Sequence, residues 1–102
     1  MSKKARRITA EQIERYALHL RERERAPATV QKYVHDLTAF MEYLDGQPAT
    51  KAALIGWKEE LARSHAPATV NSMLAAVNGF FAFLGWRGLA VKLLKIQKSP
   101  FC

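Results

Sequence analysis

Small polar and basic side chains gather on two stretches of this sequence, each of which opens with the pentapeptide APATV. They are Thr29, Gln31, Lys32, His35, Thr69, Asn71, Ser72 and Asn78. Hydroxyl, amide, imidazole and ammonium groups of this kind donate hydrogen bonds to phosphate oxygens and base edges. A helix start adds free backbone amides and positive potential. If the two pentapeptides begin two helices, the chemistry indicated is binding of duplex DNA.

Catalytic and metal-binding constellations are not predicted. The histidines, His19, His35 and His65, lack metal-ligand spacing to any acid or cysteine, and Cys102 is the only cysteine. His65 is predicted to lie in a loop. No glycine-rich loop suited to a phosphate is present in the sequence. We therefore expect no catalytic residue, no metal and no cofactor in this chain. The lone cysteine favours a reducing, cytoplasmic compartment.

The charge balance also favours a polyanionic partner. Sixteen Lys and Arg residues against nine Asp and Glu residues give a net charge of +7, and no carboxylate side chain follows Glu60. Such an excess suits nucleic acid first and an anionic membrane second. The stretch 66–86 carries no formal charge, but it contains Pro67, and its apolar residues form a stripe. We interpret it as a soluble amphipathic helix and expect no membrane partner.

Apolar residues recur with the 3.6-residue period of helices in four stretches, which predicts helices over 10–24, 26–44, 50–63 and 66–84. A short fifth helix is expected over 89–95. Thr9 and Gln12 have the spacing of a capping box, and a proline suits the first turn of each helix that opens with APATV. No stretch alternates with period two, so the predicted fold class is all-α.

The duplication is longer than five residues. Segments 26–44 and 66–84 align without gaps and also share Phe40 with Phe80 and Leu44 with Leu84. Two repeats are too few for a solenoid, so we predict a compact bundle of two helical hairpins.

The faces opposite the two apolar stripes differ in character. The pattern places Asp36 on the outer polar face of the first segment. The polar face of the second segment is small and uncharged, comprising Asn71, Ser72, Ala75, Asn78, Gly79 and Ala82. This second face suits close approach to DNA; the alternative is that it packs on another helix or on a missing domain.

The two segments resemble the N-terminal core-binding, SAM-like domain of the phage integrase, or tyrosine recombinase, family. The first half of that family's pattern corresponds here to APATVQKY (26–33), Asp36-Leu37 and FMEYL (40–44). The second half corresponds to Thr69 through Leu84, and LKIQK (94–98) resembles the linker to a catalytic domain. The resemblance covers residues 10–98. It implies a core-binding domain over 9–95 and the start of the linker over 96–102, while the basic residues at the N-terminus predict a mobile arm over 1–8.

The resemblance also implies a function. A core-binding domain of this family clamps duplex DNA together with a C-terminal catalytic domain of the same parent chain, which carries out recombination. This chain would then bind DNA without cutting it, as a monomer when alone, with the parent oligomeric on DNA. Lys95 and Lys98 would follow the DNA backbone. Two departures are that many members have Arg at the positions of Ser72 and Asn78, and that Gly88-Leu89 replaces a frequent Asn-Pro. The alternative function is a helical protein–protein interaction module.

Overall fold

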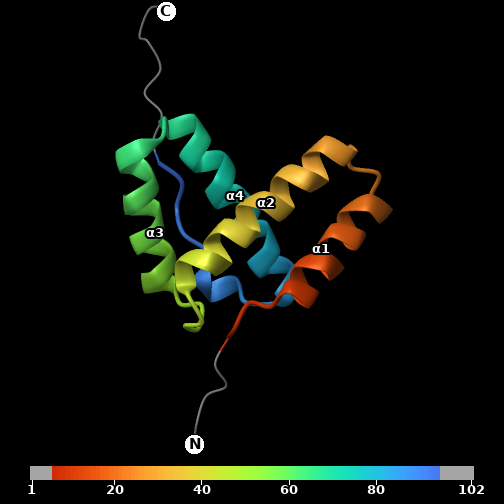
Figure 1. Cartoon of the computed structure of the whole chain (residues 1–102), viewed down its shortest axis with the longest axis horizontal. Helices are drawn as coiled ribbons and strands as arrows, with labels where there is room; N and C mark the ends of the chain where they lie inside the picture. Colours follow the sequence, from red (N-terminus) through yellow and green to blue (C-terminus); the bar gives the residue numbers. More distant parts are fainter. Residues whose placement is uncertain (1–5, 95–102) are drawn as a thin grey trace, which may run out of the picture.

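The computed structural model describes residues 6–94, which form four α-helices and one short 3-10 helix (Figure 1). The α-helices are α1 (Ala10–Glu22), α2 (Pro27–Leu44), α3 (Lys51–Ser64) and α4 (Pro67–Leu84), and the 3-10 helix is η1 (Arg87–Leu89). Within residues 6–94 no strand occurs. The all-α prediction and the four main helices are therefore confirmed.

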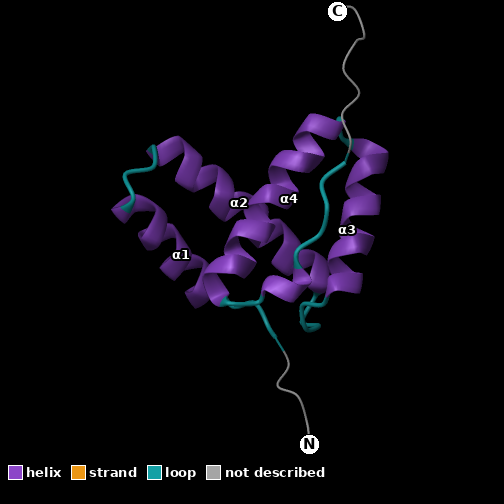
Figure 2. Cartoon of the chain, turned by 180° about the vertical axis from the view of Figure 1, so that it is seen from behind, coloured by secondary structure: helices purple, strands orange, loops and turns teal. Residues whose placement is uncertain are grey.

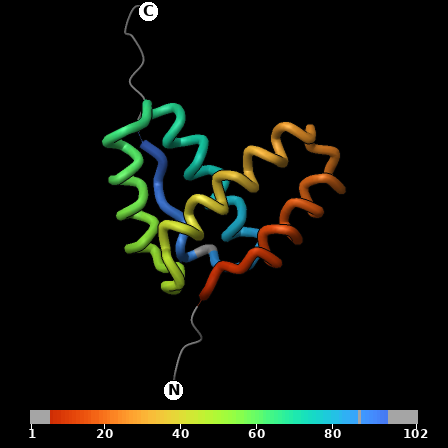
Figure 3. The backbone as a smooth tube through the Cα atoms, in the orientation of Figure 1, coloured from red at the N-terminus to blue at the C-terminus, as the bar shows by residue number. Residues whose placement is uncertain are grey.

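Helices α2 and α4 cross at the centre of the molecule, with α1 against α2 and α3 against α4 (Figures 1 and 3). The duplicated apolar stripes meet at this crossing. Phe40, Phe80 and Phe81 are fully buried there, and the ring centroids of Phe40 and Phe81 are 6.2 Å apart. The repeat thus supplies equivalent core residues to two helices that share one core, which confirms the arrangement of two hairpins.

The four helices begin in two different ways. Thr9 and Thr50 cap α1 and α3 through their side-chain oxygens, and Gln12 completes the predicted capping box at Thr9. Helices α2 and α4 begin with a proline after Ala26 and Ala66, which have no side chain able to cap. The two helices of the repeat therefore leave their first amides without a capping side chain.

Removing the cap of α1 should weaken the fold. We expect Thr9→Ala to lower the free energy of unfolding by about 1 kcal/mol, because the Gln12 amide loses its acceptor. Urea unfolding followed by circular dichroism measures this change. Thr29→Ala is the matched control, since Thr29 caps nothing, and it should stay within about 0.5 kcal/mol of wild type. Equal losses in the two variants would contradict the capping role.

The chain after α4 departs from the prediction. Gly85 ends α4 in the left-handed conformation (φ 81°), as expected of a glycine terminator. A helix over 89–95 is wrong for the described residues: η1 ends at Leu89, and residues 90–94 are not helical. Figure 2 shows this last segment lying between α4 and α3. Its contacts are described below.

The start of the described chain is packed onto the domain. Ile8 is buried, and the backbone amide of Ala49 donates to the carbonyl of Arg6 over 2.7 Å. The guanidinium of Arg7 donates to the carbonyl of Gly46. Residues 6–8 thus belong to the packed domain, while the rest of the predicted arm lies outside the described residues.

Helix α4 is the one described helix long and apolar enough to span a membrane by length and composition. Its apolar side chains have another explanation, because Val70, Leu74, Val77, Phe80 and Phe81 are all buried in the core. The packing against α2 therefore accounts for the hydrophobic character of this helix.

Candidate nucleic-acid interface

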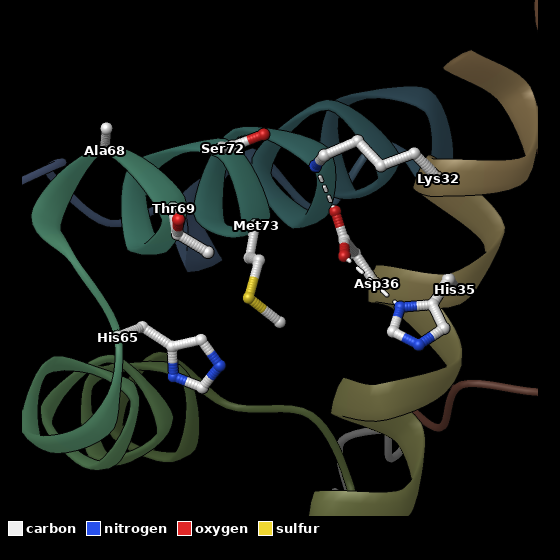
Figure 4. A pocket seen from close by; sticks show the side chains of 8 residues that line it. All are labelled: Lys32, His35, Asp36, His65, Ala68, Thr69, Ser72 and Met73. Carbon is white, nitrogen blue, oxygen red and sulfur yellow. Dashed lines mark hydrogen bonds and ion pairs between the residues drawn. The ribbon is translucent and has the colours of Figure 1, made fainter. Parts of the chain in front are cut away.

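A groove of about 410 Å³ opens between α2 and the first turns of α4 (Figure 4). It is lined by Lys32, His35, Asp36, His65, Ala68, Thr69, Ser72 and Met73. Four of the predicted site residues are among them: Lys32 and His35 from α2, and Thr69 and Ser72 from α4. The structure therefore brings together side chains from both copies of the repeat. Thr29 and Gln31 lie on the same half of α2, outside this lining.

The polar groups of the groove include one buried charge. Asp36 is only 4% exposed, and its carboxylate accepts a charged hydrogen bond from the ammonium of Lys32, one helical turn earlier. The Nδ1 atom of His35 lies 3.7 Å from the other carboxylate oxygen. Figure 4 shows the Lys32 side chain extending from α2 toward Ser72 of α4. Lys32 and Asp36 thus form an ion pair within the lining of the groove.

The structure differs from the sequence prediction at one residue of the groove and adds a role for another. The expectation that Asp36 lies on an outer polar face is wrong, because the residue is buried. His65 lies in the connection between α3 and α4, as predicted, but it also lines the groove, with Nδ1 2.9 Å from the Ser64 hydroxyl. Its place directly before the second APATV is the signal that could have identified it.

Both uncapped helix starts lie on one side of the molecule. In Figure 1, α2 and α4 begin at the top of the view and converge toward their crossing point. Pro27 and Pro67 have no amide hydrogen, and the amides of Val30 and Val70 bond within their own helices. The amides of Ala28, Thr29, Ala68 and Thr69 are left to point outward. Neither first turn contains an acidic residue, so both starts keep the positive potential of a helix N-terminus.

Two residues predicted to contact DNA, Asn71 and Asn78, form hydrogen bonds within the domain instead. Asn71 exchanges two hydrogen bonds with the backbone of Leu94, and Asn78 exchanges two with the backbone of Val91. Each side-chain amide therefore has both its oxygen and its nitrogen occupied. The expectation that they form part of an open polar face is corrected: they are partly covered.

Gly79 of the same predicted face is covered as well. The hydroxyl of Tyr16 lies 2.8 Å from the position that a Cβ atom on Gly79 would take. Ala75 and Ala82 are exposed. The small residues of α4 therefore serve internal packing at several positions, which is the alternative that the sequence left open.

The remaining predicted site residues, Lys95 and Lys98, lie outside the described residues. Within residues 6–94, no three His, Cys, Asp or Glu side chains gather as a metal site would require. Burial raises the pKa of Tyr16, with a smaller contribution from nearby Tyr33, so its hydroxyl is a neutral group packed between helices.

Comparison with known proteins gives concordant matches. The family model described as "Phage integrase, N-terminal SAM-like domain" matches residues 13–88. Two curated relatives, each a Tyrosine recombinase XerC, come from Myxococcus xanthus and from its strain DK1622, and both are 32% identical over 99 residues. The match covers 86% of this chain and 33% of each relative, so the chain spans about one third of their length. No solved structure gives a significant match.

Proposed function

The chain belongs to the phage integrase family, as its N-terminal SAM-like domain, and on that premise we propose that it binds duplex DNA through the groove face. The observation that carries the proposal is a groove that brings Lys32 and His35 of α2 beside the uncapped start of α4, with the hydroxyls of Thr69 and Ser72. Phosphate groups are bound by this combination of amides, hydroxyls and cations.

The interface we propose consists of groups that are accessible in the structure. From α2 it takes Thr29, Gln31, Lys32 and His35. From the α3–α4 junction it takes His65, the amides of Ala68 and Thr69, and the hydroxyls of Thr69 and Ser72. Asn71 and Asn78 are left out, because their amide groups are already hydrogen bonded.

The chain is proposed to bind DNA without cutting it. Recombinases are enzymes, but the matched part is one N-terminal domain. We assign strand cutting and rejoining to a catalytic domain elsewhere in the parent chain, which acts as an oligomer on DNA in the cytoplasm. The alternative role, a protein-interaction module, loses support because several small residues of α4 are covered by the chain itself.

An NMR titration of the labelled full chain with a generic duplex, at two salt concentrations, tests the proposal. We expect the amides of 28–36 and 65–72 to shift together, with a dissociation constant of roughly 10⁻⁴ to 10⁻⁶ M at physiological salt. The logarithm of the association constant should fall by about 0.9 per phosphate contact for each tenfold rise in salt.

The first turn of α3 is the internal control, because Thr50 caps it and it lies outside the groove. Its amides should stay in place throughout the titration. If the basic termini alone respond while 28–36 and 65–72 do not, the groove is not the interface and the proposal fails.

A further inference from the structure

Residues 90–94, which we call the exit segment, are attached to α4 by hydrogen bonds between two asparagine side chains and the backbone of the segment. The Oδ1 and Nδ2 atoms of Asn78 bond the amide and carbonyl of Val91 over 3.1 and 2.9 Å. Those of Asn71 bond the amide and carbonyl of Leu94 over 2.6 and 2.9 Å. An asparagine side chain is an amide, so each pair reproduces the exchange of two bonds between opposed residues of antiparallel strands.

The spacing of the two asparagines fits a chain that is nearly extended. They are seven residues apart on α4, which at 1.5 Å per residue is about 10.5 Å. Val91 and Leu94 are three residues apart, and three residues cover about 10 Å only when the backbone is close to fully extended. Two helical turns therefore match three extended residues. This match explains why residues with an apolar helical pattern, such as Leu93 and Leu94, do not form a helix.

Two further contacts hold the exit segment from the side of α3. The ammonium of Lys58 donates to the carbonyl of Lys92 over 2.6 Å, and Val91 is buried against the core. The segment runs antiparallel to α4, from Asn78 back to Asn71. It carries the chain from the end of α4 toward its beginning, where Thr69 and Ser72 line the groove. In Figure 1 the chain leaves the described part at the side where α2 and α4 begin.

We propose that Asn71 and Asn78 are positioning residues that clip the exit segment to α4 and so deliver the following chain to the groove end of the domain. The part of this role that concerns DNA rests on the proposed function. Asn71 holds Leu94 and so determines where the chain leaves α4. Asn78 holds Val91 and so determines the direction in which the exit segment runs along α4. Leu94, the last described residue, then lies at the end of α4 that carries Thr69 and Ser72 rather than at its far end.

The test combines hydrogen exchange with DNA affinity in the full chain. Asn71→Ala should raise the exchange rate of the Leu94 amide at least tenfold, while the core amide of Leu74 keeps its rate. Asn78→Ala should do the same for the Val91 amide. Asn71→Ala should also weaken DNA binding several-fold, and Asn78→Ala should weaken it less, because the anchor at the exit remains.

A double-mutant cycle separates positioning from direct contact with DNA. If Asn71 acts by positioning, Asn71→Ala should have no effect on affinity in a background that also carries Lys95→Ala and Lys98→Ala. An undiminished effect in that background would mean that Asn71 touches DNA itself, and would overturn the positioning role. Unchanged affinity in Asn71→Ala alone would overturn it as well.

The two proposals can fail separately. An unchanged exchange rate at Leu94 and Val91 in the variants would refute the clip, whatever the DNA results are. A wild-type chain that binds no duplex would refute the proposed function, whereas the exchange rates would still decide whether the clip exists.

Discussion

A Lys32→Glu variant should bind duplex DNA at least tenfold more weakly than the wild-type chain. The Lys32 ammonium projects over the groove, with 42% of its side chain exposed. Reversing its charge removes one phosphate contact and adds repulsion, which together exceed about 1.4 kcal/mol. The salt dependence should also become shallower, by about 0.9 in the slope of the double-logarithmic plot. Fluorescence anisotropy with a labelled duplex at several salt concentrations measures both quantities.

Lys51→Glu is the matched control for this experiment. It changes the net charge by the same amount, from +7 to +5, since one Lys is lost and one Glu gained. Lys51 is exposed in the first turn of α3, outside the groove, where a carboxylate suits the helix N-terminus. Equal losses for the two variants would show that total charge, and not the groove, governs binding.

Two more variants test whether the loss of affinity in Lys32→Glu comes from its charge and not from a change in folding. The carboxylate that Lys32→Glu introduces would stand one helical turn from the buried carboxylate of Asp36, so Lys32→Gln provides a neutral version that can still donate to it. It should lose affinity by a smaller factor than Lys32→Glu. Asp36→Asn should act in the opposite direction and tighten binding a few-fold, because Lys32 is then released toward the DNA phosphates. Weaker binding by Asp36→Asn would mean that Asp36 is needed to place Lys32.

Gly79→Ala should destabilise the domain by about 1–2 kcal/mol, although alanine is the better helix former. The added Cβ would lie 2.8 Å from the Tyr16 hydroxyl. Tyr16 is 7% exposed and packs against Phe80 and Phe83, with ring centroids 5.5 and 5.1 Å away, so its ring has little room to move. Overpacking costs about 1–3 kcal/mol, and we expect the upper part of that range, about 2–3 kcal/mol, where the ring cannot move. After a gain of about 1 kcal/mol in helix propensity, the net loss is about 1–2 kcal/mol. Urea unfolding provides the measurement.

Two variants test whether the Tyr16 hydroxyl is the cause. In a Tyr16→Phe background the clash is absent, so Gly79→Ala should become neutral or stabilising. Gly56→Ala is the matched control, because its Cβ would lie 2.9 Å from the hydroxyl of Tyr43, which is 37% exposed and can turn away. It should be neutral or stabilising by up to about 1 kcal/mol. A loss in Gly56→Ala as large as in Gly79→Ala would contradict this explanation.

The helices could be predicted because each is encoded by local signals. The apolar stripe of α2 returns in α4, and both stripes are buried where the two helices cross. Thr9 and Gln12 form the expected capping box, and Gly85 ends α4 as expected. Part of the groove follows from the same signals, because its α2 side chains come after the first APATV and its α4 side chains lie in or just after the second.

The remaining features depend on contacts between segments distant in sequence. Helical periodicity places Asp36 on a polar face, yet in the folded domain the residue is buried and paired with Lys32. Leu93 and Leu94 have the spacing of a helix, but hydrogen bonds from Asn71 hold Leu94 in another conformation. A helical pattern reports which residues share a face; it does not report which other segment will occupy that face.

The attachment of the exit segment makes the domain respond differently to a force along the axis of α4 and to a force across it. The segment lies along α4, with Val91 beside Asn78 and Leu94 beside Asn71. A pull on the chain beyond Leu94 along the helix axis loads both asparagine pairs in shear at the same moment. A pull across the axis peels the pairs open one after the other, beginning with Asn71. The exit segment therefore resists movement along α4 more strongly than movement away from it. A part attached beyond Leu94 can swing away from α4 more easily than it can be pulled along the helix.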